Sequence, residues 1–363
     1  MKHSLKNNIL FSFLVVAILG WIGCEKKPPK DDEEVKTINN DLRLYIANEG
    51  NYGSGNSSLS LYYLNSEKVF NNVFEKNNNE ALGDVLNDIA LVNNNLWLVV
   101  NNSNKIEIID TFNHKKIHSI NISQPRNITI LDATRVLITS MYFNKLYVVN
   151  TNNYQIEKTI IFPYPNVENL VVHQQFAYVC NWDTACNKIY KVNIETLNIE
   201  DSLSIPYKAP QSICIDKENH LWVLSGNIYS NVTSRLTVLD LNGSIIKQFQ
   251  FPNNADLIKL KTNASKDVIY FLGVDYQNNG NNPYNGVFKL PIQATEIPSK
   301  AFIMATTLQY FWDYSINPTN NDIFISDPKG FIQKGDVLIY NDAGNYKSQF
   351  ETSIGTGKLF FMP

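Results

Sequence analysis

The stretch Leu96–Asp110, LWLVVNNSNKIEIID, contains two apolar runs around a short polar centre. The first run is apolar on both faces of an extended chain, and the second interrupts its isoleucines with a single Glu. Asn and Ser at the centre are turn residues, because their side chains can satisfy local backbone groups. The stretch therefore predicts a β-hairpin whose strands are covered on both faces.

The same unit recurs along the chain at spacings of 40 to 54 residues. A second and a third strand follow each repeat of the central strand, and a fourth strand precedes it. Four short strands at a period in the forties are typical of propeller blades, and no amphipathic helical stretch competes with this pattern. The centres of the equivalent strands are Tyr45, Trp97, Leu137, Tyr178, Trp222, Tyr270 and Phe324.

The two ends of this repeat array predict how the ring closes. The first set of strands lacks its innermost member, whereas the last set is complete by Ser353 and leaves Lys358–Met362 over. The leftover strand would supply the missing inner strand, so that no open sheet edge remains. The prediction is an all-β, seven-bladed propeller over residues 42–363, with four-stranded antiparallel blades and the C-terminal strand in blade one. The strands expected in the first set are Arg43–Asn48, Ser58–Leu64 and Val69–Phe74.

The N-terminal segment resembles a bacterial lipoprotein leader. Lys2 and Lys6 precede the apolar run Ile9–Ile22, which is too short to span a bilayer comfortably. Cys24 would become the lipidated N-terminus, although Trp21 stands where such leaders usually have Leu. An ordinary secretory leader with a chance Cys is the alternative.

Residues 1–23 are accordingly assigned to the signal peptide, and residues 24–41 to the lipidated Cys and a tether. The sequence of 25–40, EKKPPKDDEEVKTINN, is charged and contains Pro, so it cannot bury apolar surface and should be disordered. Its acidic run resembles the surface-export signals of Bacteroides-type lipoproteins, with a plain solvated spacer as the alternative. The expected location is the outer membrane, lipid-anchored and exposed at the cell surface.

Composition and motifs argue against several classes of function. The 363 residues are 44% hydrophobic and 18% charged, with a net charge of −3 and no basic face for nucleic acid. None of the five His has a nucleophile context, and no Gly-rich phosphate loop or zinc motif is present. We therefore expect no catalytic residues, no metal and no cofactor, and His side chains at the surface. Cys180 and Cys186 could be bridged or free, and Cys214 reads as a small core residue.

The loops of the predicted propeller differ between its two rims. Loops between the second and third strands of each blade emerge on the same rim as the segments that lead into the first strand, and we call this the loop-rich rim. These loops are long, rich in Gly and Asn, and carry aromatic residues, whereas the opposite rim has shorter turns. The loop aromatics expected to bind a ligand are Tyr52, Tyr142, Trp182, Tyr229, Tyr276 and Phe331.

The inner strands add polar residues at the mouth of the central channel. Two aligned columns start these strands: Asn87, Arg126, Glu168, Gln211 and Trp312, then Asp88, Asn127, Asn169, Ser212 and Asp313. From them, Trp312 is expected to pack against a ligand and Arg126, Asp88 and Asn127 to orient it. A concave site with aromatic walls and a few polar groups is the usual form of a small-molecule pocket. The alternative is that propeller channels are wet and need polar mouths in any case.

Four stretches resemble a known family. They are Asn48–Ser60 (NEGNYGSGNSSLS), Ala81–Asp88 (ALGDVLND), Asn101–Asp110 (NNSNKIEIID) and Asp327–Tyr340 (DPKGFIQKGDVLIY), and they look like the YncE-like seven-bladed propeller lipoproteins of Bacteroides-type bacteria. The resemblance covers Leu42 to the C-terminus. That family includes the BtuG-type surface lipoproteins, which bind cobalamin and seat it on a TonB-dependent transporter.

The resemblance implies capture of a small molecule, with cobalamin or another corrinoid favoured, and its transfer to a TonB-dependent outer-membrane receptor. Individual cobalamin contacts cannot be carried over by motif, so the candidate residues rest on the rim geometry. The alternative is a non-catalytic interaction module that binds a protein or glycan at the cell surface, because a fold alone does not decide function.

Overall fold

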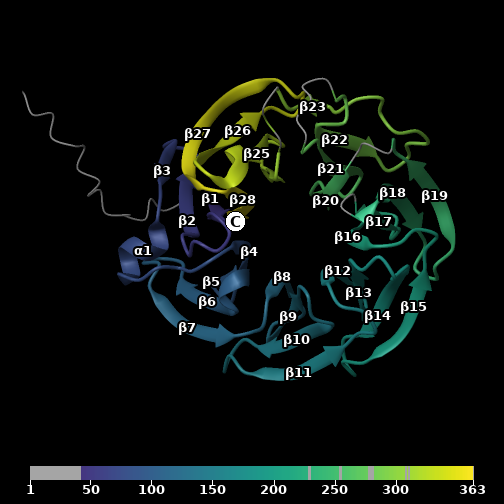
Figure 1. Ribbon diagram of the computed structural model, residues 1–363, viewed down its shortest axis with the longest axis horizontal. Helices are drawn as coiled ribbons and strands as arrows, with labels where there is room; N and C mark the ends of the chain where they lie inside the picture. Colours follow the sequence, from purple (N-terminus) through teal and green to yellow (C-terminus); the bar gives the residue numbers. More distant parts are fainter. Residues whose placement is uncertain are drawn as a thin grey trace, which may run out of the picture. The chain divides into compact units, whose positions relative to one another are not determined.

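The computed structural model describes residues 42–227, 230–252, 256–276, 282–306, 309 and 311–362. Within these residues the chain forms seven four-stranded antiparallel sheets arranged around a central axis (Figure 1). This confirms the predicted seven-bladed propeller. The predicted signal peptide, Cys24 and the tether lie outside the described residues. In the described part of the chain, no helix is both long enough and apolar enough to cross a membrane.

In every blade the strands follow one another in chain order from the central channel outward, except that the C-terminal strand is the inner strand of blade one (Figure 1). Blade one holds β28 (Thr356–Met362), β1 (Arg43–Asn48), β2 (Ser58–Tyr63) and β3 (Lys68–Phe70); blade two holds β4 (Leu86–Val92), β5 (Asn95–Val100), β6 (Lys105–Asp110) and β7 (Lys116–Asn121). Blade three holds β8 (Pro125–Ile130), β9 (Arg135–Ser140), β10 (Lys145–Asn150) and β11 (Ile156–Ile161); blade four holds β12 (Val167–His173), β13 (Phe176–Asn181), β14 (Lys188–Asn193) and β15 (Ile199–Ser204). Blade five holds β16 (Pro210–Ile215), β17 (Leu221–Asn227), β18 (Val232–Leu239) and β19 (Ile245–Gln250). Blade six holds β20 (Asp256–Thr262), β21 (Val268–Val274), β22 (Gly286–Pro291) and β23 (Ile303–Met304); blade seven holds β24 (Asp313–Ile316), β25 (Ile323–Asp327), β26 (Lys334–Tyr340) and β27 (Tyr346–Ile354).

The core lies between successive blades, which explains why the middle strands are apolar on both faces. Trp97 and Ile106 of blade two share one cluster of buried side chains with Ile138 and Tyr147 of blade three. Trp97 is only 1% exposed. Burial of apolar area between the sheets is the main favourable term that holds such blades together.

The ring closes through the C-terminal strand, as predicted. β28 pairs antiparallel with β1, from Arg43 opposite Met362 to Asn48 opposite Thr356, and Figure 1 shows it on the inner side of that strand. Leu359 is buried in the apolar cluster that joins blades seven and one. The first and last parts of the propeller are therefore locked within one sheet.

The expected strand Val69–Phe74 is wrong in its second half. β3 ends at Phe70, and a short helix, α1, runs from Val73 to Asn78. Asn72 takes a left-handed conformation with φ 58°, which turns the chain between the two apolar pairs. Val73 and Phe74 are still buried, but from a helix. A short apolar run does not distinguish a strand from a buried helical turn by periodicity.

The interpretation of the His residues as surface side chains is wrong for His114. This residue is 1% exposed, and its Nε2 atom lies 2.9 Å from the hydroxyl of Tyr45 in the neighbouring blade. Burial lowers the pKa of His114 to about 4, with the nearby Arg43 acting in the same direction. The imidazole is therefore a neutral part of the junction between blades one and two.

The three cysteines of the propeller are free and buried. Burial raises the pKa of the Cys180 thiol well above its usual range. Cys180, Cys186 and Cys214 therefore act as small core residues, and the bridge considered between Cys180 and Cys186 is not formed.

Candidate ligand-binding site

A recurring turn in blades one to five positions a residue at the start of the loop on the loop-rich rim. The residue directly before the inner strand has a positive φ, and its carbonyl accepts a hydrogen bond from the N–H of a residue at the end of the second strand or directly after it. Turns of this kind bring distant parts of a blade to one edge of the channel. The donor and acceptor pairs are Glu49 with Gly355, Asn101 with Val85, Met141 with Gln124, Trp182 with Asn166, and Gly226 with Ala209, at 2.7 to 3.0 Å.

The polar columns of the inner strands coincide with breaks in strand register. The ladder shifts between Leu86 and Asp88 in blade two, and between Pro125 and Ile128 in blade three. Comparable shifts occur in β12, β16 and β20. A bulge re-aims side chains and is common beside binding sites. Several of the aligned residues, among them Arg126, Asn127 and Glu168, are therefore able to line the channel mouth.

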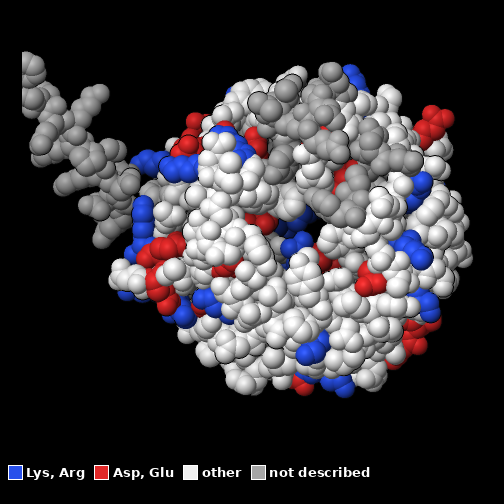
Figure 2. Space-filling model, viewed as in Figure 1, with Lys and Arg blue, Asp and Glu red and all other residues white. Residues whose placement is uncertain are grey.

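Two pockets lined by described residues open at this rim, and Arg126 lines both. The first, which we call the channel pocket, has a volume of about 150 Å³ and lies at the mouth of the central channel. The second, the rim pocket, has a volume of about 360 Å³ and lies over blades one to three. Figure 2 shows basic and acidic side chains gathered around the central hollow of the propeller. The two pockets form one candidate site with a shared arginine.

Most of the predicted residues are brought together here. Tyr52, Tyr142 and Phe331 line the rim pocket with Arg126. The residues that line the channel pocket with Arg126 are Asn127, Trp182, Tyr276 and Trp312. Tyr229 lies outside the described residues.

Asp88 lines neither pocket, so the structure gives it a different position from the expected one. It is 4% exposed, and its carboxylate is already engaged. One oxygen accepts from the Lys358 ammonium at 2.9 Å, and the other accepts from the backbone N–H of Ile128 at 3.1 Å. Asp88 therefore joins the inner strands of blades one, two and three below the mouth.

Arg126 is held rigidly between three blades. Its Nε atom donates to Glu168 Oε1 at 3.0 Å, and its Nη1 atom donates to Asn87 Oδ1 at 2.6 Å. The planar guanidinium is therefore fixed in orientation by partners on both sides. A fixed cation of this kind can orient a ligand without having to become ordered on binding.

The aromatic wall is fixed by hydrogen bonds from its indole groups. Trp312 Nε1 donates to Glu49 Oε1 at 2.6 Å, and the Phe331 ring packs edge-on against Trp312 with centroids 5.2 Å apart. Trp182 Nε1 donates to the carbonyl of Gly226 at 2.8 Å. Since these N–H groups are satisfied within the protein, the ring faces remain available for apolar packing.

Three charged residues at this site were not predicted. Burial raises the pKa of Asp256 to about 6, although the Tyr276 hydroxyl donates to it and opposes the rise. Burial also raises the pKa of Glu49, which lies below Trp312. Lys259 lines the channel pocket from blade six. Two of the three could have been predicted from the sequence. Glu49 belongs to the NEGN motif of residues 48–51, and Lys259 occupies the position of the second polar column in blade six.

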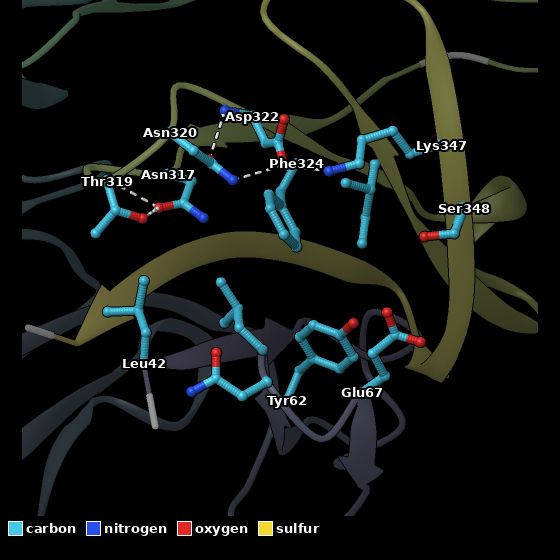
Figure 3. Close-up of a pocket in the computed structure, with 13 residues that line it drawn as sticks. Leu42, Tyr62, Glu67, Asn317, Thr319, Asn320, Asp322, Phe324, Lys347 and Ser348 are labelled. Atoms are coloured by element: carbon cyan, nitrogen blue, oxygen red, sulfur yellow. Dashed lines mark hydrogen bonds and ion pairs between the residues drawn. The ribbon is translucent and has the colours of Figure 1, made fainter. Parts of the chain in front are cut away.

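A third pocket, of about 420 Å³, lies on the opposite rim between blades seven and one (Figure 3). Its polar groups mostly bind one another. Lys347 lies 2.6 Å from Asp322 Oδ2, which also accepts from Asn320 Nδ2 at 2.9 Å. Thr319 Oγ1 donates to Asn317 Oδ1 at 2.7 Å. Its volume exceeds those of the channel and rim pockets, but most of its polar groups are already engaged with one another.

The third pocket has a local cause. In blades two and three a residue with positive φ in the turn before the outer strand packs onto an aromatic ring of the preceding blade. His114 lies over Tyr45 and Tyr154 lies near Trp97, with ring centroids 5.8 and 6.0 Å apart. In blade one this turn position is Glu67, with φ 54°, and its exposed carboxylate leaves the junction with blade seven unfilled.

No group of three or more His, Cys, Asp or Glu residues in the described ranges could hold a metal ion. The residues that line the candidate site offer aromatic packing, amide and hydroxyl hydrogen bonds, and a few fixed charges. These are the means by which a protein binds and orients an organic molecule.

Comparisons with known proteins agree with this architecture. A family model described as a domain of unknown function (DUF5074) matches residues 43–355. A search of curated proteins finds no match. A quinonprotein alcohol dehydrogenase-like protein from Bacteroides thetaiotaomicron is similar with a TM-score of 0.64 and 11% identity, over 87% of this chain and 77% of that chain.

Two further solved structures are similar. Hydrazine synthase from Kuenenia stuttgartiensis has a TM-score of 0.59 and 12% identity, over 74% of this chain and 86% of that one. Apo AztD from Citrobacter koseri has a TM-score of 0.56 and 9% identity, over 88% of this chain and 97% of that one. At these identities the similarity shows the fold alone.

Proposed function

The chain belongs to the family of the domain of unknown function DUF5074, and we propose that it is a surface lipoprotein that captures a small molecule. Cobalamin or another corrinoid is the favoured ligand, and a TonB-dependent outer-membrane transporter is the proposed recipient. One observation carries the proposal: aromatic residues from several blades and the fixed Arg126 converge on two adjoining pockets at one rim.

The shape of the site suits a large, partly apolar ligand. The rim pocket lies in the range of roughly 300–1,000 Å³ typical of small-molecule sites. Tyr52 and Tyr142 stand 78% and 63% exposed beside it, so they could cover a part of the ligand that projects from the pocket. A corrinoid would place one edge in the channel pocket and the rest of its ring over the rim. The resemblance to BtuG-type lipoproteins favours this ligand class.

We propose binding without catalysis. Arg126 and Glu168 pair with each other, and Asp256 accepts a hydrogen bond from Tyr276. These arrangements fix the side chains, whereas a general acid or base needs reach to a reacting group.

Membrane attachment would come from Cys24. Acyl chains on this residue would anchor the propeller, since buried lipid contributes roughly 0.8 kcal/mol per methylene. A Cys24→Ser variant should therefore appear in the soluble fraction. Retention of this variant in the membrane with unchanged mass would contradict the lipid anchor, and protease treatment of whole cells would test surface exposure separately.

The direct test of ligand capture is calorimetric titration of the soluble Cys24→Ser chain with cyanocobalamin. Trp182→Ala and Trp312→Ala should each weaken binding by about 2 kcal/mol or more, as is typical for central aromatic contacts. Phe112→Ala is the matched control, because Phe112 is an aromatic residue 64% exposed in a turn of the opposite rim. His114 is unsuitable as a control, since it is buried against Tyr45.

The outcomes separate the parts of the proposal. Absence of binding at micromolar protein would remove cobalamin as the ligand, and tight binding that neither tryptophan affects would place the site elsewhere. The alternative function is a non-catalytic module whose rim binds a protein or glycan, which the high exposure of Tyr52 and Tyr142 favours. In that case cyanocobalamin should not bind, and a Tyr52→Ser, Tyr142→Ser double variant should lose retention of the macromolecular partner from outer-membrane extracts.

A further inference from the structure

The channel pocket contains a buried carboxylate oxygen that no protein group satisfies. Glu168 is 8% exposed, and its Oε1 atom accepts from Arg126 at 3.0 Å. Its Oε2 atom is buried and has no hydrogen-bond partner among the described residues. An acceptor left in this state costs about 1–3 kcal/mol, so it calls for a donor from elsewhere.

The same pocket contains a cation that the described residues leave unpaired. Three other cations on the described inner strands each have a carboxylate partner: Arg126 with Glu168, Lys261 with Asp313, and Lys358 with Asp88, at 3.0, 2.5 and 2.9 Å. Lys259 is half-buried and lines the pocket, yet its ammonium makes no ion pair or hydrogen bond within the described ranges. Among the described residues, Lys259 acts electrostatically on the carboxylates of Glu49 and Asp313 but forms no ion pair with either, so its N–H donors remain available to a ligand.

The backbone at Lys259 supports this interpretation. Lys259 has φ 58°, an uncommon conformation for a residue with a side chain, and it falls within the bulge of β20. Its carbonyl accepts a hydrogen bond from the Tyr314 hydroxyl at 2.9 Å, which holds the strained residue in place. Strain of this kind persists where the surrounding structure enforces it and is concentrated at functional sites.

We propose that the ligand carries an anionic group next to a hydrogen-bond donor, and that the channel pocket binds both groups. The anion, a carboxylate, sulfonate or phosphate, binds the Lys259 ammonium, and the neighbouring N–H or O–H donates to Glu168 Oε2. The apolar body of the ligand then lies against Trp182, Tyr276 and Trp312. This inference rests on the proposed function, because it names the chemical class of the captured molecule.

The test uses two dyes that differ in one group. Anilinonaphthalene sulfonate has an aromatic body, an N–H and a sulfonate, whereas phenylnaphthylamine has the same body and N–H without the anion. Fluorescence titration of the full Cys24→Ser chain should give tighter binding of the sulfonate. Lys259→Met should raise the dissociation constant of the sulfonate dye about tenfold, equivalent to about 1.4 kcal/mol. The dissociation constant of phenylnaphthylamine should change by no more than about twofold.

Three variants complete the design. Lys259→Arg should retain sulfonate binding, because it keeps the charge. Lys188→Met removes an exposed lysine at the start of β14, outside both pockets, and should leave the affinity for both dyes unchanged. Glu168→Gln keeps an oxygen acceptor for Arg126 but replaces Oε2 by an amide N–H₂ donor. Because the N–H of either dye then loses its acceptor, the variant should bind both dyes several-fold more weakly.

The results distinguish this inference from the proposed function. If both dyes bind and Lys259→Met affects them equally, the anion subsite is wrong while ligand capture stands. If Glu168→Gln affects neither dye, the donor half of the inference is wrong. If neither dye binds the wild-type rim and cyanocobalamin does not bind either, both the inference and the proposed small-molecule function fail.

Discussion

Asp256 indicates that the candidate site is not arranged for stability. It is 5% exposed, and burial raises its pKa from 3.8 to about 6. Since the folded-state pKa lies above the unfolded value, the native protein binds the proton more tightly. The free energy of unfolding should therefore fall as pH rises from about 4 to about 6, and the loss should persist at higher pH. A buried acid kept at such a cost in a pocket is a sign of function.

Asp256→Asn tests this reasoning. The amide can still accept from the Tyr276 hydroxyl but cannot ionise, so the variant should be more stable than wild type at pH 7.5 by about 2 to 3 kcal/mol. The gain should vanish below pH 4. Asp240→Asn is the matched control of opposite sign, because the backbone N–H of Ser244 and other donors lower the pKa of Asp240. Chemical denaturation at several pH values gives both comparisons, and a pH-independent gain for Asp256→Asn would contradict the assignment.

In the turns before the outer strands, one residue position closes the junction with the preceding blade. His114, Tyr154 and Leu197 occupy this left-handed position in blades two, three and four, and each packs toward the preceding blade. Blade one has Glu67 there, beside the pocket of about 420 Å³. Because Leu197 has φ 55° and Glu67 has φ 54°, leucine fits this backbone as well as glutamate does.

Glu67→Leu should therefore stabilise the propeller by about 1 kcal/mol, from partial burial of the new side chain against Phe324. A rise in the thermal midpoint measures the effect. Ser66→Leu, at an exposed position of the same turn, should give no such gain. If both substitutions raise the midpoint equally, the turn position does not seal the junction.

The sequence predicted strands well where periodicity and β-propensity agree, and less well where a single backbone conformation decides. The central strands around Trp97 were identified because both faces are buried between blades. Asn72 could not be recognised as a left-handed residue, so α1 was taken for a strand. At the site, alignment found the polar column with Arg126. It could not show that Lys358 already engages Asp88 from blade one, because that contact forms only when the ring closes.

Closure of the ring is the property of the whole molecule on which the candidate site depends. β28 completes blade one and brings Lys358 to Asp88 of blade two. Its turn is tight: Gly355 has φ 73°, and a Cβ atom there would lie 2.8 Å from backbone atoms of Gly50. The carbonyl of Gly355 also accepts from the N–H of Glu49, which in turn accepts from Trp312. The last strand thus holds one side of the rim pocket as well as the ends of the propeller.

Deletion of residues 355–363 should therefore remove the cooperative thermal transition and cause aggregation, because it exposes the edge of β1 and the buried junction between blades seven and one. A synthetic peptide of residues 355–363 should restore the transition when added in excess, since an unpaired strand edge can accept an added strand. A peptide of the same composition in scrambled order is the control and should restore nothing. A truncated protein that melts like the full chain would show that the fold does not need the closing strand, and the dependence of the rim pocket on closure would fall with it.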